Sequence, residues 1–219
     1  MLDYLKKDYG FIFDLDGVIC STDEYHYQVW QAMADSLGIP FDRERNNLLR
    51  GVSRMACIEI IMEKTDKIYT AEEKASFVES KNTYYRSLLA NMSEADLSDD
   101  VKNTLDKLRN LGLKLAIGSS SKNAPFILER IGLADFFDAV SDGNNINHSK
   151  PHPQVFQMEA DMLGLKPEEC LVVEDAHAGI EAGVAGGFDC AAIGDARDDE
   201  RAVFHLDKLS DILYKCELL

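Results

Sequence analysis

The chain has 219 residues, more than most single domains, and its 39 acidic and 23 basic side chains give it a formal net charge of −16. This charge, with no block of Lys and Arg, argues against nucleic acid or an anionic membrane as a partner. With 46% hydrophobic residues the composition is that of a folded globular protein, and no stretch approaches the roughly 20 apolar residues that span a bilayer.

The five cysteines are scattered along the chain and include no Cys-x-x-Cys pair. Their odd number and their hydrophobic neighbours predict buried, reduced thiols. The N-terminus lacks the apolar segment of a signal peptide. We therefore expect a cytoplasmic protein. We also expect it to be a monomer and its partner to be a small molecule.

The first predicted element is a buried strand over residues 9–13, which runs into the loop Asp-Leu-Asp-Gly of residues 14–17. Residues 21–24 read Ser-Thr-Asp-Glu, the form of a capping box at the start of a helix. In that helix His26, Trp30 and Met33 share one face, and Gly38 is expected to end it.

Residues 22–92 carry only helical patterns. Helices are predicted over 43–49, 54–64 and 71–91, and none of these segments alternates with a period of two. We predict that residues 22–92 form an all-helical insert.

Beyond residue 92, apolar strands alternate with helices, which is typical of a parallel sheet with helices on both faces. Strands are predicted over 113–117, 137–140, 171–173 and 190–193, and helices over 101–111, 124–131, 153–163 and 176–185. The predicted fold is α/β. It is a doubly wound parallel, Rossmann-like sheet core of residues 1–21 and 93–219, with an inserted α-helical cap of residues 22–92.

Chemically active side chains follow these strands, and the carboxyl ends of parallel strands meet at one edge of a sheet. The residues are Asp14 and Asp16; Ser119, Ser120, Ser121, Lys122 and Asn123; Ser149-Lys150-Pro151; and Glu174 and Asp175.

These residue types suit phosphoryl transfer. A carboxylate can attack phosphorus to form an acyl phosphate, and several carboxylates suit Mg²⁺, a hard cation. A metal and a lysine together neutralise the phosphoryl oxygens, and backbone N–H groups at a helix start add donors. A second aspartate can act as general acid if its neighbours raise its pKa. The sequence predicts a magnesium-dependent phosphoryl-transfer enzyme with Asp14 as nucleophile.

The order D-x-D-G, a serine after a strand, Lys-Pro and Glu-Asp resembles the haloacid dehalogenase-like superfamily of phosphohydrolases and phosphomutases over nearly the whole chain. The resemblance implies Asp14 as nucleophile, Asp16 as general acid and base, and Ser119 and Lys150 as the groups that hold the phosphoryl group. The implied Mg²⁺ ligands are Asp14, the backbone carbonyl of Asp16 and Asp175, with Glu174 nearby.

Three further segments look like the β-phosphoglucomutase branch of that superfamily. They are Thr22-Asp23-Glu24-Tyr25-His26, Arg50-Gly51-Val52-Ser53-Arg54 and Ser121-Lys122-Asn123-Ala124-Pro125-Phe126. This implies that Arg54, with Ser121 and Asn123, holds the phosphate that is not transferred, and that His26 ties cap closure to the placement of Asp16. Thr22, Arg50, Gly51, Ser120 and Lys122 complete the predicted substrate-binding set.

The chain departs from that branch at three places. It has Arg50 where lysine is usual, Cys20-Ser21 where Thr-Asp is usual, and Ala176 where serine is usual. Arginine keeps the charge of lysine but not its shape, so hinge behaviour and substrate preference stay open.

Simpler interpretations also stay open. His26 can be a packed, hydrogen-bonded histidine, and Arg54 can be a charge at a helix start. His148 and His152 flank Lys150 without a spacing that suits a metal, so we expect them to be loop residues.

Three functions follow in order of preference. The first is a mutase that interconverts β-D-glucose 1-phosphate and glucose 6-phosphate through a bisphosphate. The second is a sugar-phosphate phosphatase that uses Asp14 with water as acceptor. The third is a non-catalytic sugar-phosphate sensor, which the intact set of carboxylates disfavours.

Overall fold

The computed structural model describes residues 9–49 and 53–217, and these divide into two compact units. The described part of Thr22–Met92 forms one, the helical unit. The described residues before Thr22 and after Met92 form the other, the core unit.

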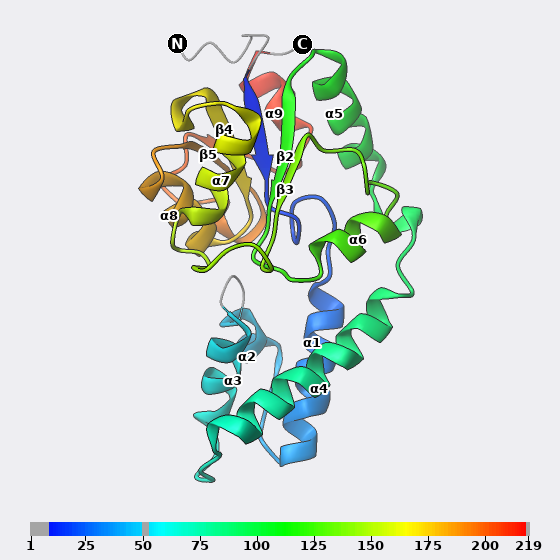
Figure 1. Cartoon of the computed structure of the whole chain (residues 1–219), viewed down its shortest axis with the longest axis vertical. Helices are drawn as coiled ribbons and strands as arrows, with labels where there is room; N and C mark the ends of the chain where they lie inside the picture. Colours follow the sequence, from blue (N-terminus) through cyan, green and yellow to red (C-terminus); the bar gives the residue numbers. More distant parts are fainter. Residues whose placement is uncertain (1–8, 50–52, 218–219) are drawn as a thin grey trace. The chain divides into compact units, whose positions relative to one another are not determined.

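A single parallel sheet of six strands organises the described residues of the core unit (Figure 1). The strands are β1 (Gly10–Phe13), β2 (Lys114–Gly118), β3 (Ala139–Ser141), β4 (Cys170–Glu174), β5 (Asp189–Ala192) and β6 (Phe204–His205). Their order is β3-β2-β1-β4-β5-β6, so the chain first moves outward from β1 to β3 and then crosses to β4 on the other side of β1. The switch point between β1 and β4 is where ligands bind in open sheets of this kind.

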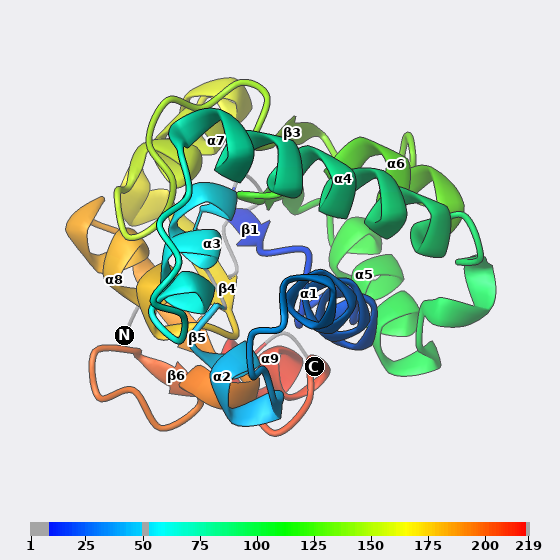
Figure 2. The ribbon, with the colours of Figure 1, turned by 90° about the horizontal axis from the view of Figure 1, so that it is seen from below.

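Helices cover both faces of this sheet, which explains why β1 and β4 are apolar runs without alternation. Figure 2 shows α7 and α8 on one side of the sheet and α5, α6 and α9 on the other. The bounds are α5 (Asp99–Asn110), α6 (Ala124–Arg130), α7 (Gln154–Leu163), α8 (His177–Ala185) and α9 (Asp211–Lys215). Short 3-10 turns lie at Glu94–Asp96, Pro167–Glu169 and Gly194–Ala196. The predicted doubly wound parallel fold is confirmed.

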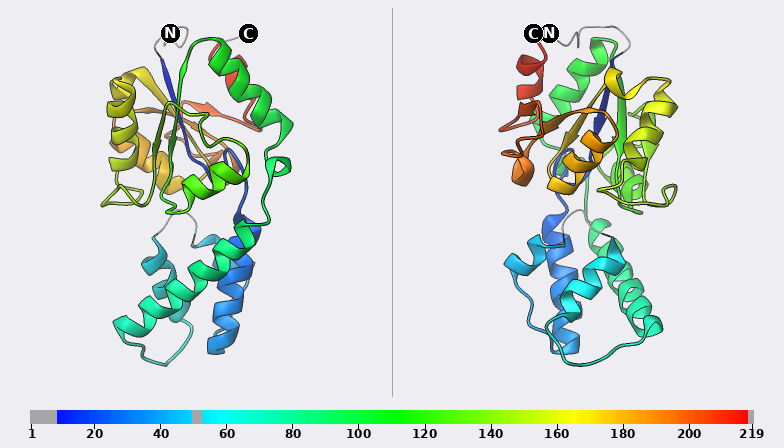
Figure 3. Two further views of the ribbon diagram at one scale, coloured as in Figure 1. Left: turned by 45° about the vertical axis from the view of Figure 1, so that its right-hand side comes forward. Right: turned by 90° about the vertical axis from the view of Figure 1, so that its left-hand side faces the viewer.

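The helical unit contains α1 (Asp23–Leu37), α2 (Arg43–Asn47), α3 (Arg54–Met62) and α4 (Ala71–Leu89). Helix α4 packs along α1, as both views of Figure 3 show. The helical unit has its own hydrophobic cluster, in which Trp30 of α1 and Ile58 and Ile61 of α3 are buried.

The start of α1 differs from the sequence prediction. The capping box with Ser21 is wrong, because α1 begins at Asp23 with Thr22 in the N-cap position and with no side-chain cap hydrogen bond. The Thr22 hydroxyl instead lies 2.7 Å from the hydroxyl of Tyr85, with which it shares a buried hydrogen bond. Gly38 ends the helix as predicted, in the left-handed conformation with φ of 69°.

Two short elements, β6 and α9, were not predicted, and the two residues of β6 are too few to show a periodic pattern. The five cysteines are free and buried, as predicted. None of the helices in the described ranges combines the length and the apolar character needed to cross a membrane.

Candidate active site

Three charged side chains from distant parts of the chain meet at the switch point. Asp14 follows β1, Glu174 ends β4, and Lys150 precedes α7. The Nζ of Lys150 lies 2.5 Å from Oδ1 of Asp14 and also donates to Oε1 of Glu174. All three are at most 8% exposed. Burial alone would lower the pKa of Lys150, but the Asp14 and Glu174 carboxylates outweigh it and raise that pKa, so the lysine stays charged.

Asp175 adds a further carboxylate to this cluster. Burial, and then repulsion from Asp14, Glu174 and Asp16, raise the pKa of Asp175 to about 9. Burial also raises the pKa of Glu174, although Lys150 opposes the effect. One lysine therefore does not balance the carboxylates gathered here.

Gly17 makes room for Asp175. Its φ of +94° is one that side chains rarely adopt, and a Cβ on Gly17 would lie 2.0 Å from Oδ2 of Asp175. The loop that carries Asp16 is closed by the Gly17 N–H, which donates to the carbonyl of Cys20 at 2.7 Å. Asp16 itself is partly exposed.

The loop after β2 holds the predicted hydroxyl and amide groups. Ser119 is buried, and its N–H donates to the carbonyl of Ser141 on the neighbouring strand at 3.0 Å. Its Oγ accepts from the N–H of Ser121, and the Oγ of Ser121 accepts from the N–H of Asn123. These internal bonds occupy two of the N–H groups that the sequence suggested for a phosphate, and α6 begins only at Ala124.

The remaining members of this loop differ in exposure. The Oγ of Ser120 is buried and has no hydrogen-bond partner among the described residues, so it can still serve a ligand. Asn123 is buried at the start of α6, whereas Lys122 is exposed to solvent. His148 and His152 lie in the loop around Lys150, as expected, with their ring centres 4.7 Å apart and the rings tilted by 32°.

The donor set of this edge suits a hard divalent cation. Its side-chain donors are carboxylate oxygens. Burial first, and then repulsion between these carboxylates, raises the pKa values of Glu174 and Asp175, and a divalent cation would relieve that repulsion. Within the described residues, no three carboxylate, imidazole or thiolate side chains form a complete ligand set. Mg²⁺ needs none, because it binds through one or two carboxylates and completes its shell with water and phosphate oxygens.

In the helical unit the structure places three of the predicted residues. Thr22 and His26 lie at the start of α1, and Arg54 is the half-buried first residue of α3. Burial, followed by the charges of Lys81 and Arg54, lowers the pKa of His26 well below its ordinary value of 6.5. The predicted residues Arg50 and Gly51 lie outside the described residues.

Sequence reasoning missed Lys81, which is only 5% exposed on α4. Its Nζ lies 3.2 Å from Nδ1 of His26, to which a charged lysine can only donate. The same Nζ lies 4.5 Å from the ring centre of Trp30 and 4.6 Å from that of Tyr85, within the range of cation–π attraction. The helical unit thus buries the Lys81 amine between two aromatic rings and beside His26.

Comparison with known proteins places this geometry in a family. The model of the haloacid dehalogenase-like hydrolase family matches residues 10–187. The chain is 38% identical over 185 residues to β-phosphoglucomutase from Bacillus subtilis (strain 168), covering 84% of this chain and 82% of that protein. It is 31% identical over 188 residues to fructose-1-phosphate phosphatase YqaB from Escherichia coli (strain K12), covering 84% and 95%.

A solved structure shows the same likeness in three dimensions. The crystal structure of β-phosphoglucomutase from Clostridium difficile is 33% identical, with a TM-score of 0.87 over 96% of this chain and 97% of that chain. The relatives include both phosphomutases and phosphatases, and this chain is a phosphoryl-transfer enzyme of one of these two kinds. The chain belongs to the haloacid dehalogenase-like hydrolase family.

Proposed function

We propose that the protein is a β-phosphoglucomutase, which interconverts β-D-glucose 1-phosphate and glucose 6-phosphate through an aspartyl-phosphate on Asp14. The observation that carries this proposal is the cation cluster of the helical unit, where Lys81 is buried against His26 and the charge of Arg54 acts on the same imidazole. A mutase must hold both phosphate groups of a bisphosphate, whereas a phosphatase needs one phosphate site. The helical unit, acting as a cap, would supply the second site.

The residues of the core unit divide the chemistry between them. A carboxylate oxygen of Asp14 forms a bond to phosphorus while the bond from phosphorus to the sugar oxygen breaks. Asp16 gives its proton to the departing oxygen and takes one back when the other hydroxyl of the sugar attacks the aspartyl-phosphate. Lys150 and Ser119 hold the phosphoryl group in line, and the cap excludes water from it.

Asp14, the backbone carbonyl of Asp16, and Asp175 would hold Mg²⁺, with Glu174 beside them. Bound there, the cation would supply positive charge to the phosphoryl oxygens. The excess of carboxylates over Lys150 at this edge supports the assignment.

A coupled assay tests the proposal. Purified protein is mixed with β-glucose 1-phosphate, Mg²⁺ and a trace of glucose 1,6-bisphosphate, and glucose 6-phosphate is measured by its enzymatic oxidation. We expect steady product formation that ends on addition of EDTA and is absent in Asp14→Asn. No product above the blank would reject mutase activity on glucose.

A phosphatase for a small sugar phosphate is the second candidate, favoured by the 31% identity to fructose-1-phosphate phosphatase YqaB. It would use the same Asp14 chemistry with water as acceptor. Release of inorganic phosphate from a panel of sugar phosphates, without isomerisation, would favour this candidate. If Asp14→Asn retains full activity, both candidates fail together.

We also propose that the enzyme works as a monomer in the cytoplasm, on a small-molecule sugar phosphate and without nucleic acid or membrane as partner. Five free, buried thiols and the net charge of −16 support this setting. Light scattering coupled to size-exclusion chromatography gives the mass, and a value well above 24.5 kDa would contradict the monomer.

A further inference from the structure

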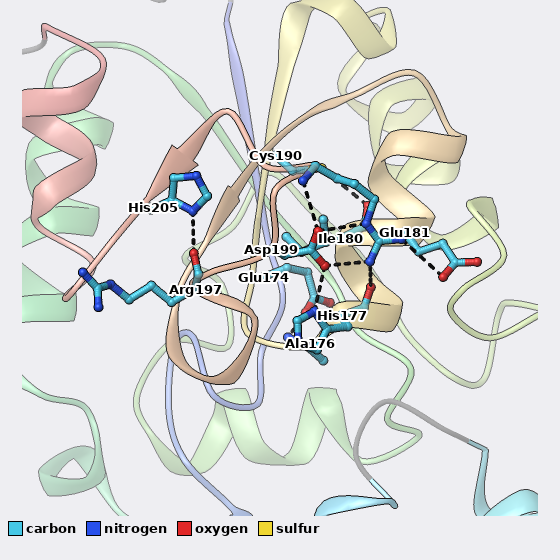
Figure 4. A network of polar contacts seen from close by, with 10 residues as sticks. Glu174, Ala176, His177, Ile180, Glu181, Cys190, Arg197, Asp199 and His205 are labelled. Carbon is cyan, nitrogen blue, oxygen red and sulfur yellow. Dashed lines mark hydrogen bonds and ion pairs between the residues drawn. The ribbon is translucent and has the colours of Figure 1, made fainter.

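Asp199 is a buried carboxylate outside the site described above. It accepts three hydrogen bonds from the side chains of Arg201 and His177. It lies in the segment between β5 and β6, and its side chain is 6% exposed. The guanidinium of Arg201 donates to it twice, from Nε to Oδ1 at 2.8 Å and from Nη2 to Oδ2 at 2.6 Å. Nδ1 of His177 donates to Oδ2 at 2.7 Å. Figure 4 labels Asp199 and His177 and shows hydrogen bonds that meet at the Asp199 carboxylate.

The same segment binds the turn that joins β4 to α8. The N–H of Ile193 donates to the carbonyl of Glu174 at 2.9 Å, and the N–H of Ala196 donates to the carbonyl of Asp175 at 2.8 Å. The Nη2 of Arg201 reaches the carbonyl of His177 at 3.3 Å. Residues 193–201, which we call the bracket, thus fix three of the four carbonyls from residue 174 to residue 177.

No side-chain hydrogen bond caps the N-terminus of α8, which follows this turn. Ala176 occupies the N-cap position of α8 and has no side chain that could cap the helix. Within the turn, Oε2 of Glu174 accepts a hydrogen bond from the N–H of Ala176 at 2.9 Å. The first residue of α8, His177, is held by Asp199 through its ring and by Arg201 through its carbonyl.

We propose that Asp199 is a positioning residue for the phosphoryl-transfer site: through His177 and Arg201 it fixes the turn that carries Glu174 and Asp175, and so sets the affinity of the site for Mg²⁺. This inference rests on the proposed function, because it takes Asp175 as a metal ligand. The Arg201 guanidinium holds the pKa of Asp199 well below its usual range, so the carboxylate that forms the anchor stays ionised.

Isothermal titration of the chelator-treated protein with MgCl₂ tests the inference without an activity assay. We expect Asp199→Asn to raise the dissociation constant for Mg²⁺ about 3- to 10-fold, at the lower edge of what outer-shell partners of metal ligands contribute. The mutant should regain most of its turnover at saturating Mg²⁺, which a loss of folded protein would not permit.

Asp207→Asn is the matched control. It breaks another aspartate–arginine pair between β5 and α9, in which Arg197 Nη2 lies 3.0 Å from Asp207 Oδ1. Within the part of the chain that the structure describes, the Asp207 side chain makes no hydrogen bond or ion pair with residues 174–177. Its Mg²⁺ affinity should equal that of the wild type. Arg201→Lys serves as the second variant if Asp199→Asn fails to fold, because the Arg201 side chain is 40% exposed. Lysine keeps the positive charge but lacks the planar guanidinium that donates two hydrogen bonds to Asp199.

Each result decides the question. A higher dissociation constant in Asp199→Asn or Arg201→Lys, with Asp207→Asn unchanged, supports the positioning role. Equal Mg²⁺ affinity in wild type and variants overturns the role of Asp199 and leaves the proposed function standing. Absence of Mg²⁺ binding in the wild type overturns both.

Discussion

Lys150 and Asp14 lie 136 positions apart in sequence, yet the lysine Nζ is 2.5 Å from a carboxylate oxygen of the aspartate. The pair is buried, and Glu174 shares the lysine. A buried charge cluster of this kind is costly to break by removing one member, because the partners that remain lose their compensation.

Lys150→Met should therefore affect both stability and catalysis. We expect the free energy of unfolding to fall by about 3 kcal/mol, the usual order when a buried ion pair loses one partner, and turnover to fall at least about 100-fold. Urea denaturation followed by fluorescence, together with the coupled assay, measures both quantities. Lys166→Met is the control, since that side chain is 74% exposed and should change neither. A Lys150→Met protein as stable as the wild type would show that the cluster is not held by this lysine.

Glu159 on α7 predicts a pH dependence of stability. It is fully buried, neither carboxyl oxygen has a hydrogen-bond partner of good geometry, and burial raises its pKa from 4.5 to about 7 although the nearby Ser141 opposes this. The folded state binds this proton more tightly than the unfolded state does. The contribution of protonated Glu159 to the free energy of unfolding is therefore fully present below about pH 4.5 and is lost as the pH rises through about 7. Across that window it should cost on the order of 3 kcal/mol of unfolding free energy.

Glu159→Gln removes the ionisable proton and should flatten this part of the profile. Melting temperatures of wild type and mutant, measured between pH 5 and pH 8, are expected to converge at the acid end and to diverge at the neutral end, with the mutant the more stable. Asp161→Asn on the exposed side of the same helix should follow the wild type. Parallel profiles for Glu159→Gln and wild type would contradict the assignment.

Gly17→Ala should lower turnover for a reason that can be separated from backbone strain. The added Cβ would meet Oδ2 of Asp175 at 2.0 Å, so either the loop or the carboxylate must move. Gly164 has a similar positive φ of +68° but open space around its missing Cβ. Both alanine variants should lose about 1 kcal/mol of stability from the left-handed conformation, and only Gly17→Ala should lose about 100-fold or more in turnover. Equal turnover in the two variants would refute the steric argument.

The hydroxyl pair of Thr22 and Tyr85 joins the start of α1 to α4. Thr22→Val and Tyr85→Phe should each lower the free energy of unfolding by about 1–2 kcal/mol, because each removes the same buried hydrogen bond. The double variant should cost less than the sum, with a coupling energy of about 1 kcal/mol in a double-mutant cycle. Strict additivity would mean that the bond contributes nothing.

Most of the sheet could be predicted from the sequence because its central strands are continuous apolar runs. Residues 9–13 and 171–173 are buried on both faces, and the polar residues that follow them reveal which edge carries the chemistry. Asp14 and Lys150 were predicted to meet for this reason, and they do. The strand β6 could not be foreseen, because two residues show no pattern.

The parts that sequence reasoning missed depend on long-range partners. The hydroxyl of Thr22 is paired with Tyr85, which lies 63 residues away, and no local rule for a capping box can anticipate that pairing. Lys81 did leave a signal, because it shares the buried stripe of α4 with Val78 and Tyr85, where a lysine is out of place. Asp199 stands in a run of charged residues that resembles an ordinary solvated loop, and only the folded chain sets it against His177.

The pairing of β1 with β4 places Phe13 opposite Val173, and the N–H of Asp14 continues the ladder by donating to the carbonyl of Val173 at 2.9 Å. Side chains alternate along a strand, so a slip of one residue would turn Asp14 or Glu174 to the opposite face of the sheet. The charge cluster is therefore specified by the lengths of these two strands as much as by the residues that end them. An insertion or deletion in β1 or β4 would shift this register, so we expect these two strands to accept substitutions only. The described residues of the helical unit form no strands, and changes of length there leave the register intact.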